Sequence, residues 1–289
     1  MSKSPACLII PFFDEKKKMA WMRPKRFPVY FKYFIDSYSR NVTTKLKIFT
    51  NVSCREFIDK YQHSSIEFHQ ISLKKMFGLI KDKLGVSGYD YDQYRAYKIC
   101  DYKPTFGHVF SEYLEGFDYW GYIDPDVIVG DLDSFLNTDN LVGYDVISGG
   151  RNNFTGYMSL FRNVKAMRFL YQESPDHARV INSSSNFRFD ENGGKRGIVA
   201  MEQVIRNNNI SIKYLNCAHN DFGKIRDLVD NSDREWVYDW VDGKLTDRLT
   251  GEEIAMLHLM KSKANPNFTF QKFRDGSNFS ISQTGLCYK

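Results

Sequence analysis

The sequence predicts an α/β protein, with a mixed, mainly parallel sheet flanked by helices in a single domain. Short apolar runs alternate with helical patterns along the chain, which is typical of βαβ units. The 289 residues are 42% hydrophobic and 26% charged, values that exclude a disordered chain, collagen and a coiled coil. Aromatic residues make up 16% of the chain, which favours one large core.

The N-terminal part of the chain predicts strands and helices in turn. Residues 6–13 form an apolar run that predicts a buried strand. The aromatic and apolar side chains between Phe27 and Tyr38 recur at the spacing of one helical face. Further on, we expect strands at 45–50 and 66–71, a short helix at 55–61, and a helix at 73–84 that Gly85 closes. A largely parallel sheet of this kind binds ligands at the carboxyl ends of its strands.

The pattern continues less regularly towards the C-terminus. Residues 89–97 are rich in Tyr and Asp and predict a loop or cleft wall, and a helix is expected from Pro104 to about residue 115. The remaining expected elements are strands at 118–123, 144–148, 157–161, 210–215 and 254–257, helices at 164–172 and 198–206, a long loop at 173–197, and a hairpin at 236–245 that turns at Asp242 and Gly243. We expect one domain over residues 1–264, with residues 265–289 packed on it as an irregular strap.

Composition also limits the compartment and the partners. The five cysteines are scattered and form no CxxC pair, so neither a disulfide framework nor a zinc site is indicated. No stretch approaches the about 18 to 20 apolar residues of a transmembrane segment, and no secretory signal is evident. We therefore expect a cytoplasmic protein. Basic residues cluster between Lys16 and Arg26 without a nucleic-acid-binding motif, so a nucleic-acid partner is not expected.

An acidic segment is the most informative part of the sequence. Between Asp118 and Gly150 there are seven Asp and no Lys or Arg. Asp124 and Asp126 stand where a buried strand ends, and two carboxylates beside an apolar core repel each other unless a cation joins them. Oxygen ligands of this kind select Mn²⁺ or Mg²⁺. The alternative is that Asp-Pro-Asp only forms a turn.

These residues resemble a known family. An apolar strand that ends in Asp-x-Asp, after a βαβ half, resembles the GT-A fold of glycosyltransferases that use nucleotide sugars. Residues 100–132 are similar to small, uncharacterised bacterial and viral glycosyltransferase-like proteins, and the resemblance spans about residues 5–262. It implies a nucleotide-sugar donor, expected to be a UDP-sugar, and a glycan acceptor, with a xylosyl or hexosyl group transferred.

The resemblance also implies particular site residues. Asp126 would bind the metal, with Asp124 contacting the donor and sharing the metal site. His258 would be a further metal ligand and Lys261 would meet the donor diphosphate; the alternative for His258 is an ordinary core histidine. By analogy of fold, the remaining candidates for donor binding are Pro11, Phe12, Phe13, Asn51, Lys98, Lys103 and Asn153.

An inverting transferase needs a carboxylate that takes the proton from the acceptor hydroxyl. Asp190 and Glu191 lie at the end of the expected long loop, whereas Glu202 lies inside a helix and resembles the acidic pair of retaining enzymes. We favour Asp190 or Glu191, because binding and catalytic residues concentrate on loops beside strand ends.

Two other functions remain open at this point. One is a nucleotidyltransferase or phosphotransferase with Mg²⁺ held by carboxylates, although the sequence lacks the GxxxxGK[ST] pattern and so excludes a P-loop form. The other is a catalytically silent module that binds a sugar nucleotide.

Overall fold

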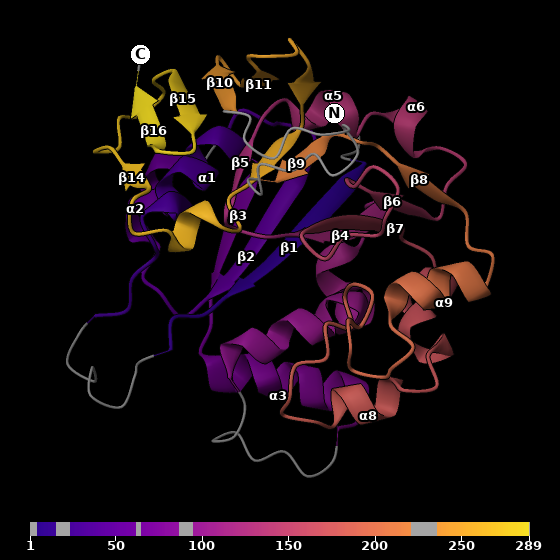
Figure 1. Ribbon diagram of the computed structural model, residues 1–289. Helices are drawn as coiled ribbons and strands as arrows, with labels where there is room; N and C mark the ends of the chain where they lie inside the picture. The colour runs from indigo at the N-terminus through magenta and orange to yellow at the C-terminus, as the bar shows by residue number, and fades with distance from the viewer. Residues whose placement is uncertain (1–4, 16–23, 62–64, 87–94, 221–235, 289) are drawn as a thin grey trace.

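A seven-stranded sheet runs through the computed structural model, which describes residues 5–15, 24–61, 65–86, 95–220 and 236–288 (Figure 1). In spatial order its strands are β3 (Ile66–Gln70), β2 (Lys45–Thr50), β1 (Ala6–Phe12), β4 (Tyr119–Ile123), β7 (Met158–Arg162), β6 (Val146–Ser148) and β8 (Ile212–Tyr214). β7 runs antiparallel to both of its neighbours, and the other neighbouring strands are parallel. The predicted α/β fold with a mixed, mainly parallel sheet is confirmed.

Helices cover both faces of this sheet because alternate side chains of its strands point to opposite faces. Leu8 and Ile10 of β1 pack on one side, and Cys7 and Ile9 on the other. The first side carries α1 (Tyr30–Tyr38), α2 (Arg55–Tyr61), α5 (Leu132–Phe135) and α6 (Thr138–Leu141). The second side carries α3 (Leu73–Leu84), α4 (Phe106–Val109), α7 (Lys165–Arg168), α8 (His177–Ile181) and α9 (Met201–Asn207).

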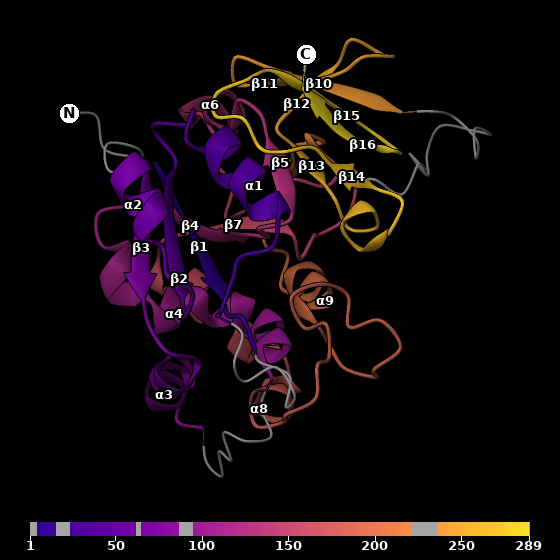
Figure 2. The same cartoon turned by 90° about the vertical axis from the view of Figure 1, so that its left-hand side faces the viewer.

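Two smaller sheets extend the domain. A three-stranded sheet has the order β5 (Val127–Val129), β13 (Met256–His258) and β9 (Ala218–Asn220). A six-stranded sheet has the order β12 (Glu253–Ile254), β11 (Lys244–Asp247), β10 (Val237–Val241), β15 (Phe279–Ser282), β16 (Gly285–Tyr288) and β14 (Thr269–Phe270). Figure 2 shows α1 between this sheet and the seven-stranded one, and Tyr33 of α1 packs in the same cluster as Trp240 and Phe279.

The predicted irregular strap from residue 265 is therefore wrong, because these residues supply β14, β15 and β16. Phe279 and Ile281 of β15 and Leu286 of β16 are buried. In β15, serines alternate with the two apolar residues and hide the strand pattern in the sequence. The predicted hairpin at Asp242 and Gly243 is confirmed, since both residues have positive φ (50° and 91°) between the antiparallel strands β10 and β11.

Short helices replace two longer predicted ones. Instead of one helix at 104–115, the chain forms a 3₁₀ helix, η2 (Ala96–Thr105), followed by α4 and by η3 (Ser111–Leu114). The predicted helix at 164–172 is divided into α7 and η4 (Leu170–Glu173). The predicted loop at 173–197 contains α8, and the strand expected at 254–257 is interrupted between β12 and β13.

Some predictions concern residues outside the described ranges. The expected cleft wall at 89–97 is described only from residue 95, and most of the basic cluster that follows the first strand lies at residues 16–23. Within the described ranges, every helix is too short or too polar to cross a bilayer.

Candidate active site

Two strands from distant parts of the sequence bring Asp126 and His258 together. Asp124 and Asp126 lie in the short connection between β4 and β5. β13 pairs antiparallel with β5 so that His258 faces Val127, the residue after Asp126. The Leu259 amide donates to the Asp126 carbonyl at 2.8 Å, which fixes this alignment. The Asp124 amide donates to the carbonyl of Tyr157 at 2.9 Å, so the residue before β7 fixes the backbone at Asp124.

Asp124, Asp126 and His258 form a cluster whose ligand atoms lie within 4.8 Å of one another. Asp126 and His258 are only 4% and 5% exposed, and Asp124 is half-buried. The His258 Nε2 atom lies 3.2 Å from Asp126 Oδ2, and its Nδ1 atom is buried without a hydrogen-bond partner among the described residues. Two carboxylates and an imidazole whose buried Nδ1 has no partner in the described part of the chain are a ligand set that suits a divalent cation.

Lys263 makes an ion pair with the Asp126 carboxylate. Burial opposes ionisation of Asp126, but the hydrogen bond and charge of His258 and the charge of Lys263 outweigh it and hold the pKa of Asp126 below its usual range. The sequence pointed to Lys261 instead. A turn of 3₁₀ helix, η5 (Ser262–Ala264), returns Lys263 to the site, and its amide donates to the Leu259 carbonyl at 3.1 Å.

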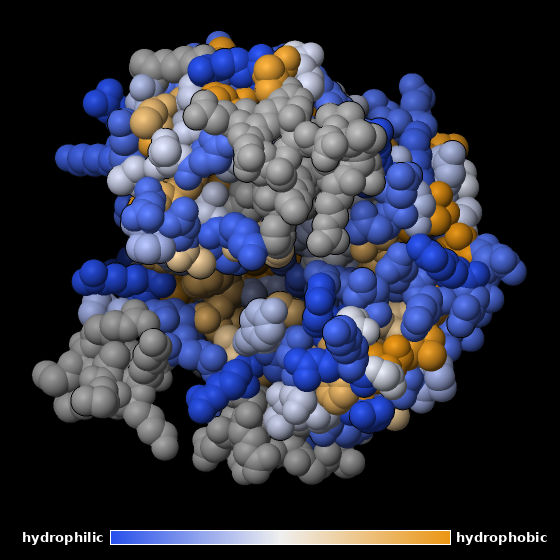
Figure 3. Space-filling model, in the orientation of Figure 1, coloured by the Kyte–Doolittle hydropathy of each residue, from blue (hydrophilic) through white to orange (hydrophobic). Residues whose placement is uncertain are grey.

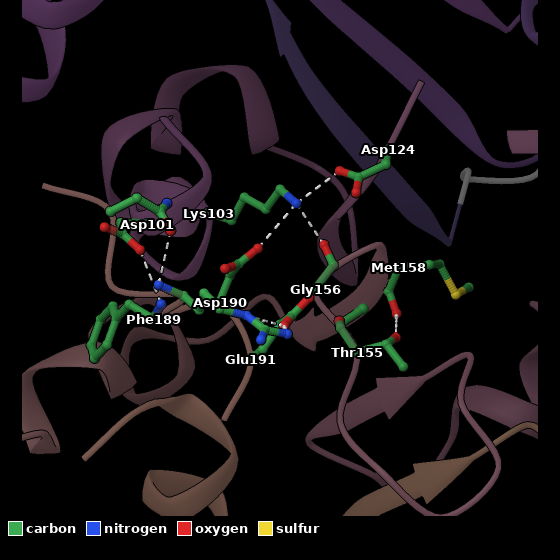
Figure 4. Close-up of polar contacts among 12 residues, drawn as sticks. Asp101, Lys103, Asp124, Thr155, Gly156, Met158, Phe189, Asp190 and Glu191 are labelled. Carbon is green, nitrogen blue, oxygen red and sulfur yellow. Dashed lines mark hydrogen bonds and ion pairs between the residues drawn. The ribbon is translucent and has the colours of Figure 1, made fainter. Parts of the chain in front are cut away.

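Lys103 joins the connection between β4 and β5 to the loop between α8 and α9, which contains Asp190 and is here named the Asp190 loop (Figure 4). Its buried Nζ lies 2.7 Å from Asp124 Oδ1, 2.6 Å from the Gly156 carbonyl oxygen and 3.1 Å from Asp190 Oδ2. Burial raises the pKa of Asp190 to about 7, with the charge of Lys103 opposing the shift and those of Glu191 and Asp124 adding to it. A single lysine thus holds two carboxylates from distant segments beside each other.

Gly156, two residues before β7, lies against the side chains of Asp190 and Glu191. A Cβ atom at Gly156 would lie 2.7 Å from Asp190 Oδ2 and 2.7 Å from Glu191 Cγ, so a larger residue fits only if these two side chains shift. Glu191 is half-buried and pairs with Arg188. Glu202 instead pairs with Arg206 on its own helix at 2.8 Å, and its amide donates to the Glu191 carbonyl at 3.0 Å. Of the three candidate bases, Asp190 contacts the lysine that also holds Asp124.

A buried ion pair between Lys98 and Asp101 holds the Asp190 loop in place. Both side chains are almost fully buried, at 1% and 0% exposure, and their charged atoms lie 2.8 Å apart. Lys98 also donates to the carbonyls of Val180 and Ser185, each at 2.8 Å, which uses all three of its ammonium hydrogens. Asp101 accepts from the amides of two loop residues, Phe187 at 2.8 Å and Phe189 at 3.0 Å. Lys98 therefore holds the loop, and the structure does not leave it a donor hydrogen for a ligand.

The other predicted binding residues make their hydrogen bonds and ring contacts with partners other than the carboxylates of the site, although the parallel register of β1 and β4 brings Pro11 level with Asp124. Phe12 packs against Phe27, with ring centroids 5.2 Å apart, and Phe13 is buried. Asn51 accepts from the Asp14 amide at 2.9 Å and donates to its carbonyl at 3.2 Å. The two remaining candidates are Pro11, half-buried in β1, and Asn153, exposed on the loop before β7.

Asp124 is the more accessible of the two aspartates. One face of the molecule is hollowed between the part that holds the C-terminal sheet and the part that holds α3 and α8 (Figure 3). The Asp124 side chain is 26% exposed, whereas that of Asp126 is 5% exposed. A ligand therefore meets Asp124 more readily than Asp126, which lies deeper.

A family model matches residues 25–288, which is most of the chain. The chain belongs to the Family of unknown function (DUF6625). A comparison with curated proteins found no match. Membership of this family assigns no activity to the chain, because the function of the family is unknown.

Several solved structures are distantly similar to this chain. The galactosyltransferase LgtC in complex with donor and acceptor sugar analogues has a TM-score of 0.44 and 10% identity, and the match covers 90% of this chain and 88% of LgtC. Apo mouse xyloside xylosyltransferase 1 has a TM-score of 0.46 and 9% identity, over 89% of this chain and 98% of its own. A nucleotide-diphospho-sugar transferase, described as putative, from Desulfovibrio desulfuricans G20 has a TM-score of 0.35 and 12% identity, over 73% and 79%.

Proposed function

We propose that this protein is a metal-dependent glycosyltransferase of the GT-A type, which moves a sugar from a nucleotide-sugar donor, a UDP-sugar, to a glycan hydroxyl. The observation that supports this most is the combination at one sheet edge of the cluster Asp124, Asp126 and His258 with two lysines, Lys103 and Lys263. Carboxylates suit a divalent cation and lysines suit phosphate oxygens, and a nucleotide-sugar transferase needs both groups together.

Asp124, Asp126 and His258 would hold the cation. Mn²⁺ suits this set better than Mg²⁺, because the imidazole supplies a nitrogen and Mg²⁺ prefers oxygen ligands throughout. When bound, the cation neutralises negative charge on the leaving diphosphate. Asp126 and His258 are held in place by β5 and β13, so the site is preorganised by the backbone.

The two lysines have different tasks in this proposal. Lys263 is partly exposed and contacts Asp126, so it can turn to the donor diphosphate. Lys103 is buried between Asp124 and Asp190 and keeps both acids oriented towards the donor sugar. Donor hydroxyls would be hydrogen-bonded by these carboxylates, whose remaining oxygens can accept.

In the transfer step, the acceptor oxygen bonds to the anomeric carbon of the donor sugar. The bond from that carbon to the diphosphate oxygen breaks, and its electron pair leaves with the nucleotide diphosphate. Asp190 or Glu191 takes the proton of the acceptor hydroxyl. Asp190 is the better candidate because a base with a pKa near the working pH is effective, and burial raises the pKa of Asp190 to about 7.

The test is to incubate the protein with Mn²⁺ and a panel of UDP-glucose, UDP-galactose and UDP-xylose, and to follow the release of UDP. We expect UDP release that EDTA abolishes. Release of UMP would indicate a phosphotransferase that moves the sugar phosphate. Release of pyrophosphate in a parallel incubation with UTP and a sugar 1-phosphate would indicate a nucleotidyltransferase instead. Tight binding of UDP without any turnover would indicate a silent binding module.

A further inference from the structure

Tyr97 is the most exposed large hydrophobic residue in the described part of the chain, at 70%. It lies in the first turn of η2, the same helix that carries Lys103. Its neighbour Lys98 is buried and held by Asp101, so the helix backbone beneath Tyr97 is fixed. A tyrosine ring on a fixed backbone offers a large contact area with little conformational freedom to lose.

Tyr97 lies on the face of η2 that meets Asp190. In a 3₁₀ helix, residues three apart lie one above the other, so Tyr97 and Lys103 share one face, and Lys103 Nζ lies 3.1 Å from Asp190 Oδ2. Although the ring is exposed, partial burial of the hydroxyl raises the pKa of Tyr97, and the charges of Cys100, Asp190 and Glu191 act in the same direction while Lys103 opposes them. The hydrogen bond and charge of Glu191 raise the pKa of Arg188, and the charge of Tyr97 adds to this shift. These electrostatic effects agree with the position of Tyr97 on the Asp190 side of the site.

Arg188 and Glu191 provide hydrogen-bonding groups on the loop that η2 holds, since Asp101 of η2 accepts from the amides of Phe187 and Phe189. The Arg188 Nε donates to Glu191 Oε2 at 3.0 Å, and the side chains remain 53% and 31% exposed. Arg188 adopts a φ of 56°, a left-handed conformation that is uncommon for a residue other than glycine and is often found at functional sites. An exposed ring is therefore combined with a guanidinium and a carboxylate on the open side of Asp190.

We propose that Tyr97, Arg188 and Glu191 form the acceptor subsite, where the Tyr97 ring stacks on the apolar face of the acceptor sugar. Arg188 and Glu191 then bond its hydroxyls, and the reacting hydroxyl points to Asp190. This inference rests on the proposed function, because it assigns the acceptor side of that same site. A carbohydrate fits these groups better than a purely apolar ligand, since the ring is bordered by charged hydrogen-bonding side chains.

The experiment measures sugar binding without requiring turnover. Methyl β-glucoside, methyl β-galactoside, methyl β-xyloside and lactose are titrated by saturation-transfer NMR into the wild-type protein, Tyr97→Ala and Tyr97→Phe. Tyr113→Ala is the matched control, because Tyr113 is also exposed, at 37%, and lies on η3. Calorimetry with UDP and Mn²⁺ monitors the donor side of each variant.

We expect Tyr97→Ala to bind the preferred sugar about 10-fold more weakly, the loss expected for one aromatic contact. Tyr97→Phe and Tyr113→Ala should bind like the wild type, and UDP affinity should not change in any variant. Equal sugar binding by Tyr97→Ala and the wild type would overturn the inference, as would a wild-type protein that binds UDP but none of these sugars. Sugar binding that depends on Tyr97, without binding of UDP, would leave the subsite standing and overturn the proposed transferase.

Discussion

Asp126 is the residue on which the proposed metal site depends most. It is almost fully buried and contacts both His258 and Lys263. We expect Asp126→Asn to lower Mn²⁺ affinity by at least about 100-fold, since loss of a ligand should exceed the 10- to 100-fold loss seen when an outer partner is removed. The affinity is measured by calorimetry. Asp139→Asn, which changes an exposed aspartate of the same acidic segment, is the control and should bind Mn²⁺ normally. Unchanged affinity in Asp126→Asn would remove this residue from the metal site.

If Asp190 is the base, the turnover number should depend on pH. A base acts in its ionised form, and burial raises the pKa of Asp190 to about 7. The wild-type kcat should therefore fall as the pH drops below about 7. Asp190→Asn should lower kcat by about 10²- to 10⁴-fold and remove this pH dependence, with UDP affinity preserved.

Glu202→Gln is the matched comparison for Asp190, because Glu202 pairs with Arg206 on its own helix. It should keep both the rate and the pH profile. An inactive Glu202→Gln beside an active Asp190→Asn would transfer the role to the helix. A retained anomeric configuration in the product, determined by NMR, would also count against a single base.

At the scale of secondary-structure elements, the buried pair of Lys98 and Asp101 connects η2 to the Asp190 loop. Asp101→Ala would leave the Lys98 charge buried without a partner and the amides of Phe187 and Phe189 without acceptors. Breaking such a pair costs about 3 to 5 kcal/mol. We expect a markedly lower Tm and faster proteolysis within residues 181–190. The control is Glu112→Ala, which removes an exposed ion pair with Lys83 and should leave the Tm almost unchanged.

The contact between β7 and the Asp190 loop is tested by Gly156→Ala. The added methyl group would lie 2.7 Å from Asp190 Oδ2, so the Asp190 carboxylate must shift from its position beside Lys103. Turnover should fall by at least about 10-fold, as expected when a catalytic group is displaced by a fraction of an ångström to 1 Å. Mn²⁺ affinity should stay the same, because Asp126 directly precedes β5 and His258 ends β13, so neither belongs to this loop. Full activity in this variant would argue against Asp190 as the base.

At the scale of the whole molecule, the sequence predicted the parts that depend on local pattern. The apolar run of β4 and the two aspartates that follow it indicated both a central strand and the candidate metal site. Lys263 could not be distinguished from Lys261, because the choice depends on a 3₁₀ turn. Neither the bridge from Lys103 to Asp190 nor the burial of Lys98 has a local signal, since each joins segments about 80 residues apart or more. The C-terminal sheet was missed for a different reason: Ser280 and Ser282 alternate with the two apolar residues of β15, so the sequence shows no clear strand pattern there.

The C-terminal sheet connects the end of the chain to the candidate active site through packing on β5. Phe279 of β15 stacks on Trp240 with ring centroids 5.1 Å apart, and the Trp240 Nε1 donates to the Val129 carbonyl of β5 at 2.8 Å. β5 follows Asp126 directly and pairs with the strand of His258.

A chain that ends at residue 264 should therefore lose Mn²⁺ binding as well as stability, because β10 loses its partner β15 and the support of β5 is weakened. Thermal unfolding and Mn²⁺ calorimetry of the truncated chain provide the measurement. Phe279→Ala is a milder variant, expected to cost about 3 to 5 kcal/mol of stability as a buried aromatic residue. If the truncated chain keeps both its Tm and its Mn²⁺ affinity, residues 265–289 are only an accessory strap, and the metal site does not depend on the C-terminal sheet.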